Sequence, residues 1–143
     1  MQKNNLQLLN YSVDKIHFDL NQSFDFGDRQ EISLDPILNR KIEKIDENRG
    51  KVSLGFIIRT ATEPLPFEIE IWISGIFELE NWEKENSSAM KVNAVAILFP
   101  FLRALVATVT SNASVSPYIL PVFNAVAWFE EAEKKQKEQK KMD

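Results

Sequence analysis

The stretch Asn93–Phe129, "NAVAILFPFLRALVATVTSNASVSPYILPVFNAVAWF", is among the least polar parts of this 143-residue chain, and it constrains the whole fold. Apolar residues recur at helical spacing in its first part, which predicts a helix over residues 89–111. One side of that helix is formed by Val92, Val95, Ala96, Phe99, Leu102, Leu105, Val106 and Val109. The opposite side is apolar too, with Ile97, Leu98, Phe101, Ala104 and Ala107. A helix that is hydrophobic all round has to be buried all round.

Burial in a membrane is disfavoured for this helix. Arg103 lies near the centre of the apolar stretch, where lipid burial of an arginine costs about 2.5–3.5 kcal/mol on the most lenient scale. We expect Arg103 to reach a carboxylate at an interface, or the helix end. Pro100 lacks a backbone N–H and is expected to kink the helix or open one turn. A single sheet covers only one side of the helix, so the other side predicts a subunit interface or a surface that binds other polypeptides.

The first half of the chain alternates between apolar and polar residues, as strands do. The clearest strand is "FEIEIWISGIFELE" at 67–80, whose Phe67, Ile69, Ile71 and Ile73 share one face. Its other face carries Glu68, Glu70, Trp72 and Ser74. Gly75 interrupts the alternation, which predicts a bulge or bend there. Further strands are predicted at 16–20, 37–46 and 51–61, although 37–46 also fits a short helix.

Short turns at 47–50 and 62–66 favour a four-stranded antiparallel meander. The predicted fold class is therefore α+β, with the sheet packed against two C-terminal helices, the second beginning at Asn124. Residues 1–131 are expected to form a single domain, and residues 132–143 a charged, solvated tail that frays.

Composition excludes several classes of function. The net charge of −4 argues against a nucleic-acid binder, and the absence of cysteine excludes disulfides and thiolate chemistry. No signal peptide is evident at the N-terminus, so a cytoplasmic location is expected. The chain has one histidine, His17, without a suitable nucleophile, and no phosphate-binding glycine loop. We therefore expect that the protein is not an enzyme and that it binds neither a metal nor a cofactor.

The chain resembles the SecB protein-export chaperones, from about Tyr11 to Phe129. The most specific likeness is the segment Leu98-Phe99-Pro100-Phe101 with the nearby Arg103. A proline-punctuated loop follows and ends in Pro121-Val122-Phe123, and Gly75-Ile76-Phe77 matches the last strand of the family. Ala104 stands where the family has an acidic residue after the arginine. The chain therefore resembles a divergent member of the family.

The resemblance implies a dimer of dimers that binds unfolded preproteins or nascent chains without ATP. It places the client-binding groove at Trp72, Ile76, Phe77, Val115, Tyr118, Ile119, Leu120 and Phe123, with Phe56 and Ile58 as further candidates. It also implies an interface between dimers at Ile97, Leu98, Phe101 and Arg103. The translocase motor SecA would dock on an acidic sheet surface at Glu68 and Glu70.

Plainer interpretations stand beside these. Each groove candidate could simply fill the core, and Glu68 and Glu70 could form a solvated strand face rather than a docking site, an acid–base pair or a metal site. The physiological alternatives to export are a chaperone dedicated to one client, such as an antitoxin, and an oligomeric interaction domain without chaperone activity.

Overall fold

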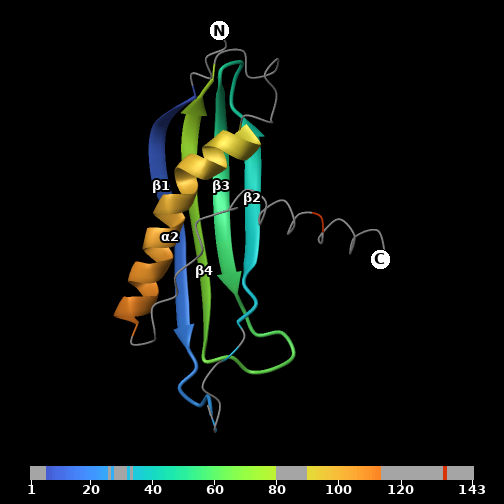
Figure 1. Ribbon diagram of the computed structural model, residues 1–143, viewed down its shortest axis with the longest axis vertical. Coiled ribbons are helices and arrows are strands. Elements are labelled where there is room, and N and C mark those ends of the chain that lie inside the picture. Colours follow the sequence, from blue (N-terminus) through green and yellow to red (C-terminus); the bar gives the residue numbers. More distant parts are fainter. Residues whose placement is uncertain are drawn as a thin grey trace.

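Four strands and a long helix form two layers in the computed structural model of the chain (Figure 1). The structure describes residues 6–25, 27, 32, 34–79, 90–113 and 134. The strands are β1 (Gln7–Leu20), β2 (Ile37–Lys44), β3 (Arg49–Ile58) and β4 (Phe67–Glu78). The helical layer begins with a π-helical turn, η1 (Met90–Ala94), and continues as α2 (Val95–Asn112). The predicted α+β fold class is confirmed, whereas the second predicted helix lies outside the described residues apart from Lys134.

The sheet is antiparallel throughout, with the strand order β1-β4-β3-β2. The predicted meander therefore holds for β2, β3 and β4, but β1 pairs with β4 instead of β2. This order places β3 and β4, whose residues are the most buried, at the centre of the sheet. The longer and more polar β1 forms one edge, where its outer side faces solvent.

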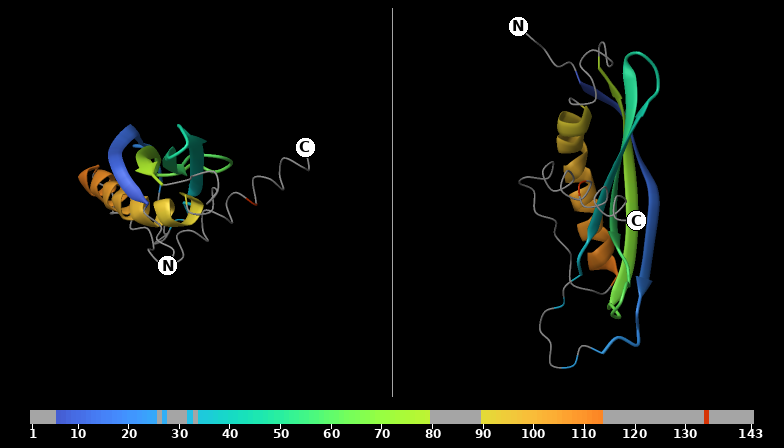
Figure 2. Two further views of the ribbon diagram at one scale, coloured as in Figure 1. Left: turned by 90° about the horizontal axis from the view of Figure 1, so that it is seen from above. Right: turned by 90° about the vertical axis from the view of Figure 1, so that its right-hand side faces the viewer.

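One face of the sheet is covered by α2, which crosses it diagonally from the β2 side towards β1 (Figures 1 and 2). The core between the two layers contains apolar residues of β2, β3, β4 and the helix. Its largest fully buried side chains are Phe56, Phe77, Leu38, Leu54, Ile58, Ile69, Ile71, Ile73, Leu98 and Leu102. The described residues place no helix or strand on the other face of the sheet, which is called the open face below (Figure 2).

The bulge that the sequence offered at Gly75, as one of two possibilities beside a bend, is not present. Gly75 pairs in unbroken register with Val52 of β3, and the irregularities lie in β1, between Leu8 and Asn10 and between Val13 and Lys15. A Cβ at Gly75 would come within 3.0 Å of side-chain atoms of Leu8, Phe77 and Leu98. The glycine thus occupies a core position where two layers approach closely, and the alternation resumes with Phe77 on the same face.

The side of the helix that faces the sheet agrees only in part with the predicted one: Val95, Phe99, Leu102 and Val106 are buried as predicted, and Leu98, predicted on the opposite side, is buried with them. Leu98 is fully buried beside Gly75, whereas Ala96 and Val92 are exposed. Leu98 shares its side of the helix with Val95 and Leu102, three residues before and four residues after it. The buried residues of α2 are Val95, Leu98, Phe99, Leu102, Val106 and Thr110. α2 continues through Pro100, which is exposed. The irregular helical turn is η1, which directly precedes α2.

Candidate functional site

The predicted groove residues do not share one surface. Trp72 and Ile76 lie half-buried on the open face, whereas Phe77 lies on the opposite face and is 0% exposed beneath the helix layer. Phe56 and Ile58 are buried in the same core. Val115, Tyr118, Ile119, Leu120 and Phe123 lie outside the described residues. Phe77 cannot contact a client without opening the core, because neighbouring residues of a strand point to opposite faces.

The predicted interface residues divide in a similar way. Phe101 is 42% exposed, and Ile97 and Arg103 are half-buried. The structure does not support Leu98 as an interface residue. Its side chain is 0% exposed in the core of the single chain and leaves no surface for a partner.

A strip of exposed apolar side chains runs along the edge of the sheet beside α2. On β1 the exposed fractions are 44% for Val13, 51% for Ile16 and 46% for Leu20, all on the helix side of the sheet. The ring of Tyr11 stacks on Phe101 of α2 with centroids 4.6 Å apart, which joins the strand to the helix. Burial, followed by the nearby charge of Asp14, raises the pKa of Tyr11 above its ordinary value.

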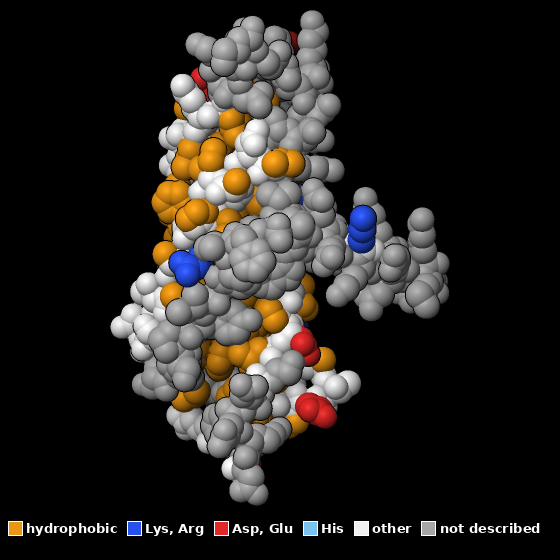
Figure 3. All heavy atoms as spheres, viewed as in Figure 1, with side chains coloured by type: hydrophobic (Ala, Val, Ile, Leu, Met, Phe, Trp, Pro, Cys, Tyr) orange, Lys and Arg blue, Asp and Glu red, His pale blue; other side chains and the backbone are white. Residues whose placement is uncertain are grey.

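We call Val13, Ile16, Leu20 and Phe101 the apolar flank. Hydrophobic side chains gather along the helix and the neighbouring sheet edge in the space-filling view (Figure 3). Within Val92–Asn112, only 33% of the most apolar stretch of 18 residues is buried. That segment is long and apolar enough to cross a membrane, yet its buried residues pack on a sheet as those of a core helix do. The exposed apolar side chains of β1 and α2 lie next to one another rather than scattered, which indicates an interaction surface.

Sequence reasoning missed Val13 because its strand was expected to begin at Ile16. The bulge between Val13 and Lys15 brings Val13 and Ile16 to the same face although they are three residues apart. This breaks the period of two on which strand prediction depends.

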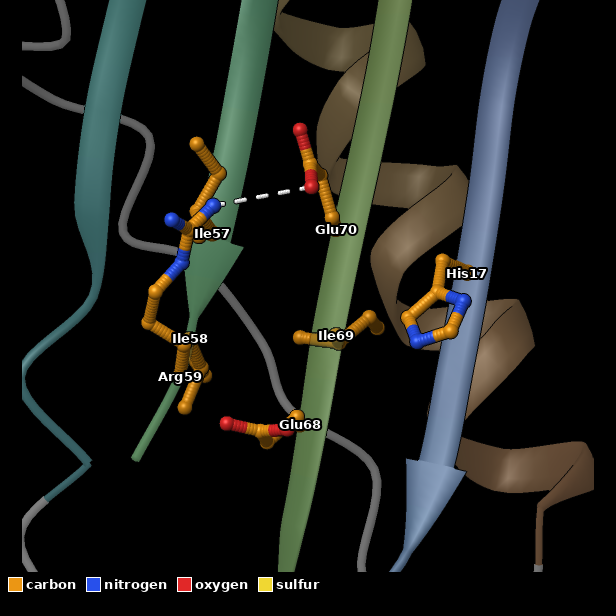
Figure 4. Close-up of a pocket in the computed structure, with 7 residues that line it drawn as sticks. All are labelled: His17, Ile57, Ile58, Arg59, Glu68, Ile69 and Glu70. Atoms are coloured by element: carbon orange, nitrogen blue, oxygen red, sulfur yellow. Dashed lines mark ion pairs between the residues drawn. The ribbon is translucent and has the colours of Figure 1, made fainter. Parts of the chain in front are cut away.

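The open face carries Glu70 at the centre of a polar network. The indole Nε1–H of Trp72 donates to Glu70 Oε2 over 2.8 Å, and Lys15 Nζ lies 3.2 Å from Oε1. Arg59 forms a longer ion pair of 3.6 Å with the same oxygen (Figure 4). The hydrogen bond from Trp72, aided by Lys15 and Arg59, lowers the pKa of Glu70 below its ordinary value.

Glu68 lies on the same face, two residues before Glu70. Its Oε2 accepts a hydrogen bond of 2.6 Å from the backbone N–H of Thr60. A hollow of about 210 Å³ beside the two glutamates is lined by His17, Ile57, Ile58, Arg59, Glu68, Ile69 and Glu70 (Figure 4). His17 Nε2 lies 3.2 Å from Asp19 Oδ2 at the exposed edge strand. Within the described ranges, no group of three or more His, Cys, Asp or Glu side chains is placed to hold a metal ion.

The side chain of Trp72 lies flat against Gly55 of β3. A Cβ on Gly55 would come within 2.6–2.7 Å of three carbons of the indole ring. Lys41 Nζ of β2 lies 4.8 Å from the ring centroid, a cation–π arrangement. Sequence reasoning missed Gly55 and Lys41, although a glycine inside a strand signals the close approach of another group.

Comparison with known proteins gives the relatives of this fold. The profile of the family described as preprotein translocase subunit SecB matches residues 2–137. An uncharacterized protein of Methanocaldococcus jannaschii is 33% identical over 125 residues, which are 83% of this chain and 79% of that protein. The protein-export protein SecB of Anaplasma phagocytophilum is 38% identical over 85 residues, 56% of this chain and 54% of that protein. The SecB of Desulfotalea psychrophila is 27% identical over 119 residues, 80% of this chain and 75% of that protein.

Two solved structures have a similar fold. A SecB-like chaperone of Mycobacterium tuberculosis, in complex with a ChAD peptide from the HigA1 antitoxin, superposes with a TM-score of 0.66 at 13% identity. The match covers 82% of this chain and 90% of that one. A protein of unknown function from Streptococcus agalactiae superposes with a TM-score of 0.53 at 17% identity, over 84% and 99% of the two chains.

Proposed function

Because the chain belongs to the SecB family, we propose that it is an ATP-independent chaperone that holds unfolded or nascent polypeptides and keeps them from aggregating. Membership of this family supports a chaperone role in protein export, carried out in the cytoplasm. It also supports a binding protein rather than an enzyme, because the relatives named SecB are protein-export proteins.

The observation that carries the proposal is the apolar character of α2 on two sides. Its sheet-facing side is buried, while Phe101 on the other side remains 42% exposed and continues into the exposed residues of β1. Surface of this kind offers area without selecting particular side chains, as a holding chaperone requires. Self-association into a dimer of dimers would cover part of this apolar surface. Unfolded polypeptides would bind to the part that remains exposed.

Two expectations that the resemblance implies remain predictions. Val115, Tyr118, Ile119, Leu120 and Phe123 are proposed to complete the client groove together with exposed apolar residues. If the chaperone serves protein export, SecA is predicted to dock at Glu68 and Glu70.

The test is to dilute a fluorescently labelled, urea-unfolded polypeptide into the purified protein, with the folded form of the same polypeptide as control. We expect saturable binding of the unfolded form without nucleotide, and suppression of its aggregation. Failure to bind any of several unrelated unfolded chains would contradict a general chaperone.

A chaperone dedicated to one client is the second candidate function. The SecB-like chaperone of M. tuberculosis, solved with an antitoxin peptide, shows that this fold holds a specific peptide in another protein. Binding of one partner from a panel of unfolded chains, with no binding of the rest, would favour this candidate.

A further inference from the structure

We propose that Gly75 is a positioning residue for the apolar flank, because the gap that this glycine leaves in the sheet fixes where α2 rests and therefore how Phe101 is presented. The role of the flank in assembly and client binding belongs to the proposed function, and this inference rests on it. The position of the helix over the sheet is nevertheless measurable whether or not that function holds.

The backbone does not explain a glycine at position 75. Gly75 lies within β4 and has no positive φ, so other residues can adopt its conformation. Its register partners have larger side chains, with Tyr11 of β1 on one side and Val52 of β3 on the other. What position 75 lacks is a side chain, and the row of side chains beneath α2 therefore has a notch at β4.

The notch at Gly75 is filled from three sides. A Cβ at this position would lie 2.8 Å from Leu8 Cδ1, 2.9 Å from Phe77 Cε2 and 3.0 Å from Leu98 Cδ2. Phe77 and Leu98 are 0% exposed, whereas Leu8 is half-buried at the edge strand. A close-packed core transmits strain. A side chain at position 75 would therefore press on Leu98 and, through it, on α2.

The same part of α2 has a second contact with the sheet, where the helix passes over β4 towards β1 (Figure 1). Phe101 follows Leu98 by three residues, about one helical turn. Its ring stacks on Tyr11 with centroids 4.6 Å apart and 29° between the planes, and Tyr11 is the register partner of Gly75. The depth at which Leu98 enters the notch thus sets how closely Phe101 lies on Tyr11.

The shape of the apolar flank depends on this contact. The flank combines Phe101 of α2, 42% exposed, with Val13, Ile16 and Leu20 of β1, which are 44–51% exposed. Well-packed apolar interfaces are as dense as protein interiors, so a displacement of the helix relative to the strand would leave gaps against a partner. Gly75 acts on the flank only through Leu98 and α2, because it lies beneath the helix and contacts no partner itself.

The test measures the position of α2 in the full-length protein. The chain has no cysteine, so spin labels can be attached through cysteines that replace Glu43, exposed on β2, and Ser111, exposed at the end of α2. Labelled chains are diluted into unlabelled ones, so that only distances within one chain are measured. We expect Gly75→Ala to change the distance between the labels and to weaken self-association by about tenfold, the effect of overpacking the core by one methyl group.

Two further variants separate positioning from a general loss of stability. Gly55→Ala is the matched control, because it adds the same methyl group to the neighbouring strand but on the open face, 2.6–2.7 Å from carbons of Trp72. It should leave the label distance and self-association unchanged. Leu98→Val, added to Gly75→Ala, removes one methylene from the side chain that faces the notch. Since this swap conserves the core volume, it should restore both quantities to within about twofold of those of the natural chain.

An unchanged label distance in Gly75→Ala, no recovery in the double variant, or an equal loss of association in Gly55→Ala would each overturn the proposal. If Gly75→Ala alone does not fold, the double variant decides, because its recovery supports the proposal and its failure contradicts it. A natural chain that neither assembles nor binds unfolded clients would refute the proposed function instead, and the label distances would still decide whether Gly75 positions α2.

Discussion

The two faces of the sheet are made by the same strands but differ in what they expose. On β4, the apolar residues that face α2, from Phe67 to Phe77, are at most 5% exposed. The alternate residues Glu68, Glu70, Trp72 and Ile76 are half-buried, and the polar ones have hydrogen-bonded partners. One face is thus stabilised by burial and the other by a polar network, so a substitution should have a different effect on each.

The largest difference is expected between two neighbours on β4. Phe77→Ala removes a fully buried ring and should lower the free energy of unfolding by about 3–5 kcal/mol. Ile76→Ala, one residue earlier on the open face, should cost well under half of that, because Ile76 is only half-buried. Chemical denaturation of both variants gives the comparison, and equal losses would contradict the two-face description.

The apolar flank, rather than the open face of the sheet, is expected to carry self-association. Phe101→Asp places a charge in the flank and should weaken assembly more than tenfold, because a buried, unpaired charge is costly. Light scattering coupled to size exclusion measures the mass. Ser111→Asp, at the exposed end of the same helix, is the control and should keep the mass of the natural chain. An unchanged mass for Phe101→Asp would exclude the flank from the assembly.

Adding a methyl group at Gly55 tests the contact between this glycine and the ring of Trp72 on the open face. Gly55→Ala should displace the Trp72 ring and cost about 1–3 kcal/mol of stability, since its Cβ would overlap ring carbons. In the background of Trp72→Ala, the same substitution should cost far less. Denaturation of the four chains of this cycle gives the coupling. Additive effects would show that the glycine serves another purpose.

The smallest effect expected is a change in pH dependence. The pKa of Glu70 is lowered in the folded state, so its contribution to stability is present above the ordinary glutamate pKa of about 4.3. That contribution is lost as the pH falls through the folded-state pKa. Glu70→Gln should therefore lose less stability than the natural chain between pH 6 and 3, in denaturation curves at each pH. Identical pH profiles would mean that the network around Glu70 adds nothing.

Much of the fold was accessible from periodicity. The alternation correctly assigned residues 67–74 of β4 to their faces, and the helical spacing located the helical segment formed by η1 and α2 to within one residue at each end. Gly75 was misread, because a missing side chain in an alternating pattern fits a bulge as well as a close approach of two layers. Only the position of Leu98 above it distinguishes the two.

Pairing between distant strands was beyond local patterns. The register of β1 with β4 depends on which strands bury the most surface at the centre of the sheet, and short turns give no information about β1. The functional surfaces were predicted less well than the fold for the same reason. Trp72 was correctly placed on the glutamate face, but its contacts with Gly55 and Lys41 join three strands and cannot be read from one of them.

Site-specific photo-crosslinking tests the central claim most directly. A benzophenone amino acid would replace either Ala104, exposed on the outer side of α2, or Ile76, on the open face. The protein would then be mixed with an unfolded client of near-neutral charge. The account predicts adducts with client or with a second copy from position 104, and none from position 76. Client adducts from position 76 alone would contradict it and would place polypeptide binding on the open face of the sheet.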